Sequence, residues 1–344
     1  MFGFVLAQRL TTLPLIWQKV EKKGIVVNRE IPADSFRLEK FTDKHVTASG
    51  EPRAVVELTG AKTLWFNTGT LCNITCTNCY IESSPENDRL VYITPAEVEK
   101  YLDQIKTRNW PTVEIGFTGG EPFMNPSMVA MARLALQRGF EVLILTNAMR
   151  PMMRDRVKAG LIDLQKTYGD KLTLRISLDH FEKQMHDKER GEGAFEKTLK
   201  GMRWLRDHNF KMAVAGRSAW ADSDAQSRAG FAALFQTEKF EIDAADPAMT
   251  VLFPEMDETV DVPEITTACW GILNKSPNDV MCANSRMVVK RRGAKKPVVL
   301  ACTLLAYSPE FELGETLESA EKPVHLNHHH CAKFCVLGGA SCSA

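Results

Sequence analysis

Six short runs rich in β-branched and aromatic residues alternate with five longer segments of helical period between residues 61 and 255. Strands that alternate with helices form right-handed crossovers, which place parallel strands in one sheet with helices packed against it. The sequence therefore predicts an α/β fold whose chemistry lies at the carboxyl ends of the strands. The predicted strands are residues 63–67, 112–117, 141–146, 172–178, 211–215 and 250–253, and the predicted helices are residues 95–105, 127–138, 152–166, 194–207 and 224–235.

The charge balance limits the kinds of partner that this chain can bind. Its 344 residues include 43 Lys+Arg and 43 Asp+Glu, so the formal net charge is zero. Dedicated binders of nucleic acid or anionic membranes need a basic field, so neither partner is expected. No apolar run approaches the roughly 20 residues of a membrane span. Gln8 and Arg9 interrupt the apolar start, which lacks a basic n-region, and we expect a cytoplasmic protein.

The nine cysteines fall into two groups that are separated by a long stretch without cysteine. Clustered cysteines in a reduced compartment indicate metal binding, whereas a disulfide framework is spread along a small secreted chain. The first group is Cys72, Cys76 and Cys79, and the second is Cys269, Cys282, Cys302, Cys331, Cys335 and Cys342.

The loop after the first predicted strand has the spacing Cys72-x3-Cys76-x2-Cys79. Three thiolates this close can hold three corners of a [4Fe–4S] cube and leave the fourth iron for a ligand that is not protein. An open metal position is generally the catalytic arrangement. A zinc site that borrows a distant fourth ligand is the alternative, and buried core cysteines are not expected in a loop rich in Thr and Asn.

The second predicted strand is followed by Gly119-Gly120-Glu121-Pro122. Paired glycines allow the backbone to approach a ligand closely, Glu121 offers an acceptor for an ammonium group, and Pro122 fixes the turn. The same four residues are also consistent with a plain connection between a strand and a helix.

Together these two loops resemble the radical S-adenosylmethionine (SAM) superfamily over about residues 61–255. The resemblance implies a partial (β/α)6 TIM-like barrel in which Cys72, Cys76 and Cys79 are catalytic cluster ligands. It further implies that SAM chelates the fourth iron, and that one electron cleaves SAM to methionine and a 5′-deoxyadenosyl radical that abstracts hydrogen from substrate. An electron donor such as flavodoxin or ferredoxin is implied as a partner.

Other positions match the pattern of the superfamily. Gly119, Gly120 and Glu121 would bind the methionine moiety, and Ser177 and Asp179 would bind the ribose or carboxylate. Strand-end capping is the alternative for Ser177 and a helix N-cap for Asp179. Two more residues extend the site.

Arg217 would grip the SAM carboxylate with its planar guanidinium, for which a surface ion pair is the alternative. Asn147 lies at the rim of the same mouth or caps its strand. Many members of the superfamily have an aromatic residue before the third cysteine, but this chain has Asn78, which leaves the packing of adenine open. Tyr80 could contact the cofactor or simply pack at a helix start.

The chain after residue 257 has spaced cysteines around a predicted β-hairpin, with strands at residues 286–290 and 297–301. This pattern resembles the SPASM and twitch extensions of radical SAM maturases, which hold auxiliary iron–sulfur clusters. The resemblance implies one auxiliary [4Fe–4S] cluster, although Cys269 and Cys342 are also compatible with small buried hydrophobes. The preferred ligands are Cys282, Cys302, Cys331 and Cys335, with Cys269 and Cys342 as alternates.

Two polar stretches in this region have a plainer interpretation. The basic turn at residues 291–296 is expected as a charged hairpin tip in preference to an RNA-binding surface. His328, His329 and His330 are expected in a solvated polar turn in preference to a ligand set.

We divide the chain into an N-terminal extension at residues 1–55, a radical SAM core at 56–256 and a SPASM-like domain at 257–344. Within the extension, residues 25–27 and 36–41 are candidate edge strands and residues 6–13 a candidate helix. The expected function is hydrogen abstraction from a peptide, protein or small metabolite, in peptide modification or in natural-product or cofactor maturation. A noncatalytic iron–sulfur or zinc scaffold and an RNA-modifying radical SAM enzyme are the alternatives.

Overall fold

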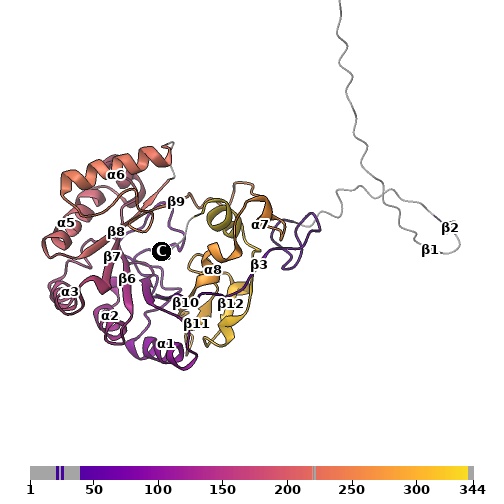
Figure 1. The fold of residues 1–344 in the computed structure, drawn as a ribbon, viewed down its shortest axis with the longest axis horizontal. Helices are drawn as coiled ribbons and strands as arrows, with labels where there is room; N and C mark the ends of the chain where they lie inside the picture. Colours follow the sequence, from indigo (N-terminus) through magenta and orange to yellow (C-terminus); the bar gives the residue numbers. More distant parts are fainter. Residues whose placement is uncertain (1–20, 23–24, 27–38, 219, 221, 340–344) are drawn as a thin grey trace, which may run out of the picture.

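A nine-stranded sheet organises the chain (Figure 1). The computed structural model describes residues 21–22, 25–26, 39–218, 220 and 222–339. The strands of the sheet are β4 (Thr63–Asn67), β5 (Glu114–Thr118), β6 (Glu141–Thr146), β7 (Leu172–Ser177), β8 (Lys211–Arg217), β9 (Thr250–Phe253), β10 (Ser285–Val289), β11 (Val298–Leu300) and β12 (Glu312–Gly314). Their order in the sheet is β12-β11-β10-β4-β5-β6-β7-β8-β9, so the sheet curves as a partial barrel and does not close.

Neighbouring strands from β10 to β9 are parallel, and β11 and β12 are antiparallel additions at one edge. β4 is buried at all five positions, which is expected of a parallel strand covered on both faces. The parallel α/β architecture predicted from the sequence is confirmed, with a TIM-like barrel that stays open.

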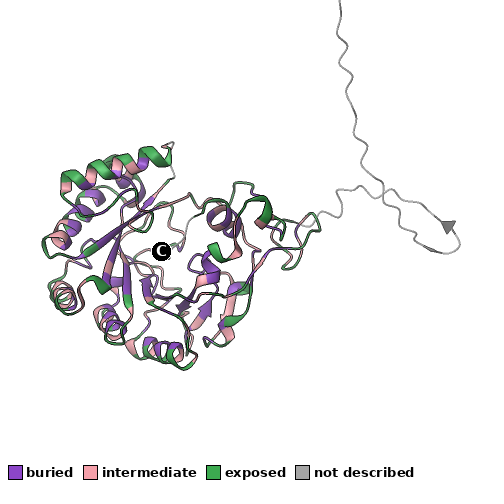
Figure 2. Cartoon of the chain, viewed as in Figure 1, coloured by how far each residue is buried: buried purple, intermediate pink, exposed green. Residues whose placement is uncertain are grey.

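Helices cover the outer face of the sheet (Figure 1). Figure 2 shows the buried strands inside and the exposed faces of these helices outside. Two of them begin with a capping box, from Thr94 and Glu97 in α1 and from Ser223 and Gln226 in α6. The helices are α1 (Pro95–Thr107), α2 (Met128–Gln137), α3 (Asp155–Tyr168), α4 (Lys183–Arg190), α5 (Ala194–Asp207) and α6 (Asp224–Glu238).

The six predicted strands and five predicted helices are all present, with ends that differ by at most three residues. Helix α4 was not predicted as an element. Its sequence KQMHDKER has no apolar stripe, and the residues that it buries are the polar His186 and Glu189.

The C-terminal part of the chain covers the inner face of the sheet. The predicted hairpin is present as β10 and β11, and the sequence did not predict that β10 would pair in parallel with β4. Trp65 and Met287 of these strands pack in one hydrophobic cluster with Leu304 and Phe334. The region also contains the short helices α7 (Cys269–Ile272) and α8 (Met281–Asn284), a π-helical segment Cys331–Leu337, and β13 (Val324–His325), which pairs with β3 (Val55–Val56).

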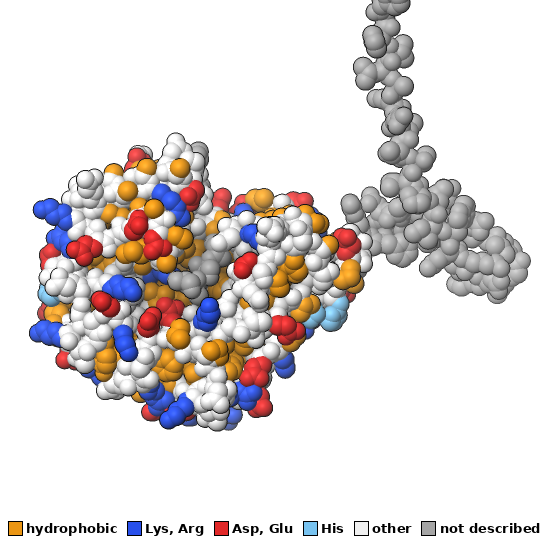
Figure 3. Space-filling model, viewed as in Figure 1, with side chains coloured by type: hydrophobic (Ala, Val, Ile, Leu, Met, Phe, Trp, Pro, Cys, Tyr) orange, Lys and Arg blue, Asp and Glu red, His pale blue; other side chains and the backbone are white. Residues whose placement is uncertain are grey.

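The basic hairpin turn is held by ion pairs within the chain. Arg291 pairs with Glu312 at 2.9 Å, Arg292 with Asp88 at 2.9 Å and Lys296 with Glu315 at 2.9 Å. Figure 3 shows basic and acidic side chains interspersed over the visible face. None of the helices in the described ranges is long and apolar enough to cross a lipid bilayer.

The predictions for the N-terminal residues have mixed outcomes. Ile25–Val26 forms β2, which pairs with β1 (Glu21–Lys22). The second candidate strand is wrong at residues 39–41, which form a turn, and its first three residues lie outside the described residues. The candidate helix at residues 6–13 and the candidate ligand Cys342 also lie outside them.

Candidate functional site

A cavity of about 1020 Å³ opens at the carboxyl ends of the parallel strands. The three cysteines of the loop after β4 line it together with residues that follow β5, β6, β7 and β8. Among the predicted site residues, the structure brings to this wall Cys72, Cys76, Cys79, Tyr80, Gly119, Gly120, Asn147, Ser177, Asp179 and Arg217.

The three thiols suit a metal cluster. Burial raises the pKa of the Cys72 thiol to about 12 and also raises that of Cys76. Both are therefore neutral near pH 7 before metal binds, and metal binding must displace their protons. Three sulfur ligands on one wall, facing an open cavity, fit a cube that leaves one iron for another ligand.

The glycine turn after β5 packs directly on the cysteine loop. The amide of Gly120 donates to the carbonyl of Gly69 at 2.9 Å, and the amide of Glu121 donates to that of Leu71 at 3.1 Å. A Cβ at Gly120 would lie 2.3 Å from the Leu71 oxygen, and one at Gly119, where φ is +139°, would lie 2.5 Å from the Gly69 oxygen. Only glycine permits this approach, so the turn fixes the backbone immediately before Cys72.

Glu121 differs from its expected position. Its carboxylate is buried and does not line the cavity. It accepts hydrogen bonds from the Thr146 hydroxyl at 2.8 Å and the amides of Asn147 and Phe123 at 2.8 and 3.2 Å. Burial raises its pKa to about 7, because these donors offset only part of the cost of burying a charge. In this structure the carboxylate joins the ends of β5 and β6 instead of facing the ligand space. Pro122 begins the next turn and is likewise buried away from the cavity.

Asn147 and Asp179 make contacts that the sequence did not predict. The Asn147 amide group donates to Asn73 Oδ1 at 3.0 Å, within the cysteine loop. Asp179 accepts two hydrogen bonds from Arg190, at 2.5 and 3.0 Å, and lies 3.3 Å from Arg217 Nε. Burial is the largest single influence on the pKa of Asp179 and would raise it, but the charge and hydrogen bonds of Arg190, together with the charge of Arg217, hold the pKa below its usual value. Asp179 therefore anchors two arginines at the cavity wall and caps no helix.

Helix α4 clamps the cysteine loop and was missed by sequence reasoning. Glu189 accepts hydrogen bonds from the backbone and side-chain nitrogens of Asn78, both at 2.9 Å. Arg190 Nη1 lies 3.8 Å from the Cys76 sulfur. Nothing in the local pattern of this helix signals contacts to residues more than a hundred positions earlier.

Arg217 is also part of this clamp. Its Nη2 donates to the Asn78 carbonyl at 2.8 Å, and its Nη1 lies 3.7 Å from Glu189. Thus Asn78, directly before Cys79, is held by two side chains of opposite charge.

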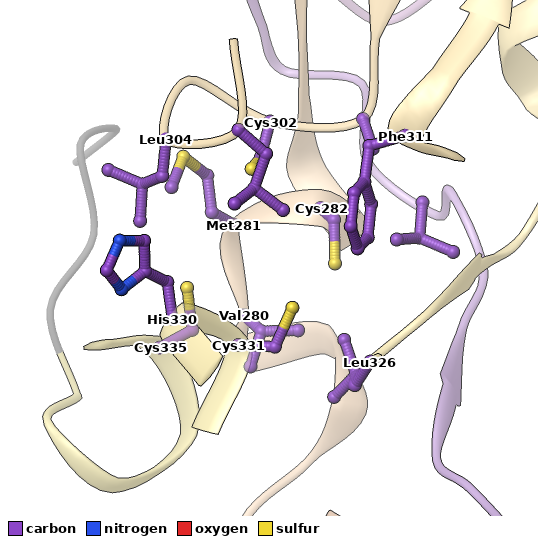
Figure 4. Close-up of a pocket in the computed structure, with 13 residues that line it drawn as sticks. Val280, Met281, Cys282, Cys302, Leu304, Phe311, Leu326, His330, Cys331 and Cys335 are labelled. Carbon is purple, nitrogen blue, oxygen red and sulfur yellow. The ribbon is translucent and has the colours of Figure 1, made fainter. Parts of the chain in front are cut away.

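A second cavity, of about 380 Å³, lies in the C-terminal region (Figure 4). Cys282 of α8, Cys302 after β11, and Cys331 and Cys335 of the π-helical segment all line it, and Figure 4 shows their sulfurs around one space. The rest of the wall is apolar except for His330. Four sulfurs around a dry space fit a cube that is ligated at every iron. These are the four ligands that the sequence favoured.

Cys269 does not belong to this cavity. Its sulfur lies 3.4 Å from both the backbone nitrogen and the hydroxyl of Thr266, and it is absent from the cavity wall.

The histidine run is not the solvated turn that we expected. His330 is buried and its Nε2 lies 3.1 Å from Glu258, while His328 Nε2 lies 3.8 Å from the same carboxylate oxygen. Burial lowers the pKa of His330 to about 4, so this ring is neutral near pH 7. The three side chains therefore form a polar cluster that packs behind the second cavity.

The two cavities are neighbours. Leu304 lines both, and Phe334, next to Cys335 in sequence, lines the first and stacks on Phe253 with ring centroids 5.4 Å apart. A group in the second cavity would thus face the first across a thin apolar wall.

Comparison with known proteins gives the family of the region around the first site. The sequence model of the Radical SAM superfamily matches residues 66–216, which contain the cysteine loop, the glycine turn and Ser177. The chain carries a radical SAM domain. Residues 66–216 thus match the domain of enzymes that use SAM and an iron–sulfur cluster.

Two curated relatives match parts of the radical SAM chain. The antilisterial bacteriocin subtilosin biosynthesis protein AlbA of Bacillus subtilis (strain 168) is 34% identical over 145 residues, which are 42% of this chain and 30% of that protein. The AdoMet-dependent heme synthase of Methanosarcina barkeri (strain Fusaro / DSM 804) is 27% identical over 149 residues, 42% of this chain and 38% of that protein. The matches therefore span less than half the length of these relatives.

Solved structures share the radical SAM fold. Streptococcus suis SuiB bound to S-adenosylmethionine aligns with a TM-score of 0.54 and 12% identity, over 77% of this chain and 64% of SuiB. The AdoMet-bound anSMEcpe structure aligns with a TM-score of 0.54 and 14% identity, over 79% of both chains. At these identities the likeness supports the fold.

Proposed function

We propose that this chain cleaves SAM reductively at its first cavity and abstracts hydrogen from a substrate held there. The observation that carries the proposal is the convergence of Cys72, Cys76 and Cys79 on one open wall, beside the Gly119–Gly120 backbone. When bound, the cluster and SAM supply one-electron cleavage of the C5′–S bond and a 5′-deoxyadenosyl radical. The chain's own residues hold and shield these groups.

Each residue in this proposal has a stated task. Cys72, Cys76 and Cys79 ligate three irons and leave the fourth exposed to the cavity. The backbone of Gly119 and Gly120 receives the methionine end of SAM, and Ser177 at the end of β7 receives the ribose or carboxylate. Glu121, in its observed position, supports this wall from behind.

Arg190 and Arg217 place positive charge where a carboxylate of SAM would lie. Asp179 orients both guanidinium groups, and burial strengthens their attraction for an anion. The opposite side of the cavity is apolar, with Phe253, Met256 and Leu304, which excludes water from a reactive radical.

We further propose that the second cavity holds one auxiliary [4Fe–4S] cluster on Cys282, Cys302, Cys331 and Cys335, within a SPASM-like unit at residues 257–344. Its shared wall with the first cavity suits electron exchange with the reaction site. A flavodoxin or ferredoxin would supply the electron for SAM cleavage, and a reducing, cytoplasmic setting would keep the cysteines available for iron.

A peptide or protein is the proposed substrate class. It is supported by the name of AlbA, a bacteriocin biosynthesis protein, and by a SuiB structure bound to the precursor peptide SuiA, which aligns with a TM-score of 0.54. Cofactor maturation is the second candidate, because another relative is named a heme synthase. The two candidates are separated by offering the protein a deuterium-labelled peptide or a deuterium-labelled tetrapyrrole. The true substrate class is the one whose deuterium appears in 5′-deoxyadenosine.

Direct chelation of SAM tests the proposed site. The reduced, reconstituted protein is mixed anaerobically with SAM carrying ¹⁵N and ¹⁷O in its amino and carboxylate groups. Electron–nuclear double resonance should then show coupling of both nuclei to a cluster, and Cys76→Ala should lose that coupling. A noncatalytic iron–sulfur or zinc scaffold would show no coupling in either protein.

A further inference from the structure

Arg286, the second residue of β10, is a fully buried cation with an unusual set of partners. Its guanidinium donates to the carbonyls of Ala320 at 2.8 Å, Ser285 at 2.9 Å and Lys322 at 3.2 Å. A fourth bond, 2.5 Å long, goes to the carbonyl of Cys282. All four acceptors are backbone oxygens, and no carboxylate of the described residues lies within ion-pair distance of this guanidinium.

Two other arginines with little exposed side chain pair with a carboxylate. Arg53 lies 2.5 Å from Glu264, and Arg190 lies 2.5 Å from Asp179. A buried charge without an opposite charge is costly, because carbonyl dipoles replace only part of the lost hydration. An arginine guanidinium is not deprotonated in proteins, so the group remains a cation near pH 7. The charge of Arg286 therefore has to be balanced by something other than an ion-paired carboxylate.

The second cavity would carry negative charge beside this guanidinium if it held a cluster. Cys282, four residues before Arg286, lines that cavity together with Cys302, and as thiolates both would attract the guanidinium. As neutral thiols they balance nothing, whereas a cube with four thiolate ligands carries net negative charge. The guanidinium does not line the cavity and is bonded to the backbone of one proposed ligand, Cys282.

We propose that Arg286 is the buried counter-charge of the auxiliary cluster and raises its reduction potential. This inference rests on the proposed function, in which the second cavity holds such a cluster. Reduction adds one negative charge to the cluster, and a fixed cation nearby favours the reduced form. Arg286 acts through electrostatics and ligates no iron.

The test measures the auxiliary cluster alone, in a chain that carries Cys72→Ala, Cys76→Ala and Cys79→Ala. In that background Arg286→Gln and Arg286→Met remove the charge, Arg286→Lys keeps it, and Arg292→Gln is the control at the exposed tip of the same hairpin. The midpoint potential comes from a redox titration followed by electron paramagnetic resonance.

The neutral variants should lower the equilibrium constant for one-electron reduction by about tenfold, a shift of about 59 mV to more negative potential. Arg286→Lys should stay closer to the parent than either neutral variant, and Arg292→Gln should match the parent. If the neutral variants lose their cluster while Arg286→Lys retains it, retention depends on the charge, which also supports the proposal.

Three results would overturn it. If the cluster is present in all variants and its potential does not move, or if all three Arg286 variants lose it alike, the arginine serves only as a hydrogen-bond donor, and the proposed auxiliary cluster still stands. If the parent with three alanines binds no iron–sulfur cluster, the auxiliary cluster itself is refuted and the counter-charge with it.

Discussion

Removing the Glu189 carboxylate should loosen the cysteine loop without touching any ligand. Glu189 is 5% exposed and accepts two hydrogen bonds from Asn78, both at 2.9 Å, directly before Cys79. Hydrogen bonds to a charged group contribute about 1.5–3 kcal/mol each, so Glu189→Ala should cost about 3 kcal/mol or more. The backbone bond from Thr77 to the Glu189 carbonyl remains, so the change is confined to the clamp.

The assay is a urea titration of the reconstituted protein, together with the rate at which a chelator removes iron. Glu189→Ala should unfold at lower urea and lose iron from the first cluster faster than wild type. Glu189→Gln should be intermediate, because its oxygen can still accept one of the two bonds. Glu192→Ala is the control, since Glu192 is exposed two residues beyond the end of α4. If Glu189→Ala and Glu192→Ala behave alike in both measurements, the clamp contributes nothing and the reasoning is wrong.

Three further changes test other parts of the site. Gly120→Ala places a Cβ 2.3 Å from the Leu71 oxygen, so it should lower the free energy of unfolding by about 1–3 kcal/mol and abolish SAM binding in equilibrium dialysis. Gly271→Ala is the control and should leave SAM binding unchanged, because no atom lies within 4 Å of the added Cβ. The pKa of Glu121 is raised to about 7, so the folded chain holds a proton that the unfolded chain releases, and stability should fall by about 3 kcal/mol as the pH rises from about 4.5 to about 7. Glu121→Gln should remove that part of the slope in urea titrations, and an unchanged slope would refute the assignment. Cys335→Ala should lower the iron content by about four per chain, while Cys269→Ala, outside the cavity, should not; equal iron content in the two variants would count against the auxiliary site.

The sequence predicted the parts of this structure that depend on local pattern. The strands were visible because each is a short apolar run between turns, and the cysteine loop because its spacing has few other uses. The four cysteines of the second cavity come from three separate segments of the chain. The sequence grouped them only because their pattern resembles the SPASM and twitch extensions.

Long-range polar contacts could not be predicted in the same way. Helix α4 has no apolar stripe, and its role depends on Glu189 and Arg190. Their partners Asn78 and Cys76 lie more than a hundred residues earlier in the sequence. Glu121 was assigned to the ligand because of its place in a motif. Its three protein donors come from two loops that only the folded sheet brings together.

The parallel pairing of β10 with β4 was missed for a related reason. A hairpin predicts its own antiparallel partner, but the choice of a third strand depends on which edge of the sheet is open. Because β10 takes the edge beside β4, Cys282 and Cys302 lie on the inner side of the barrel near the first cavity.

The most direct test of the account is SAM cleavage by the reconstituted protein under anaerobic conditions with dithionite. The wild-type chain should form 5′-deoxyadenosine and methionine in equal amounts, and Cys72→Ala, Cys76→Ala and Cys79→Ala should each form neither. Wild-type levels of 5′-deoxyadenosine from all three variants, or none from a wild-type chain that holds its full iron, would contradict the claim that this loop holds the cluster that cleaves SAM.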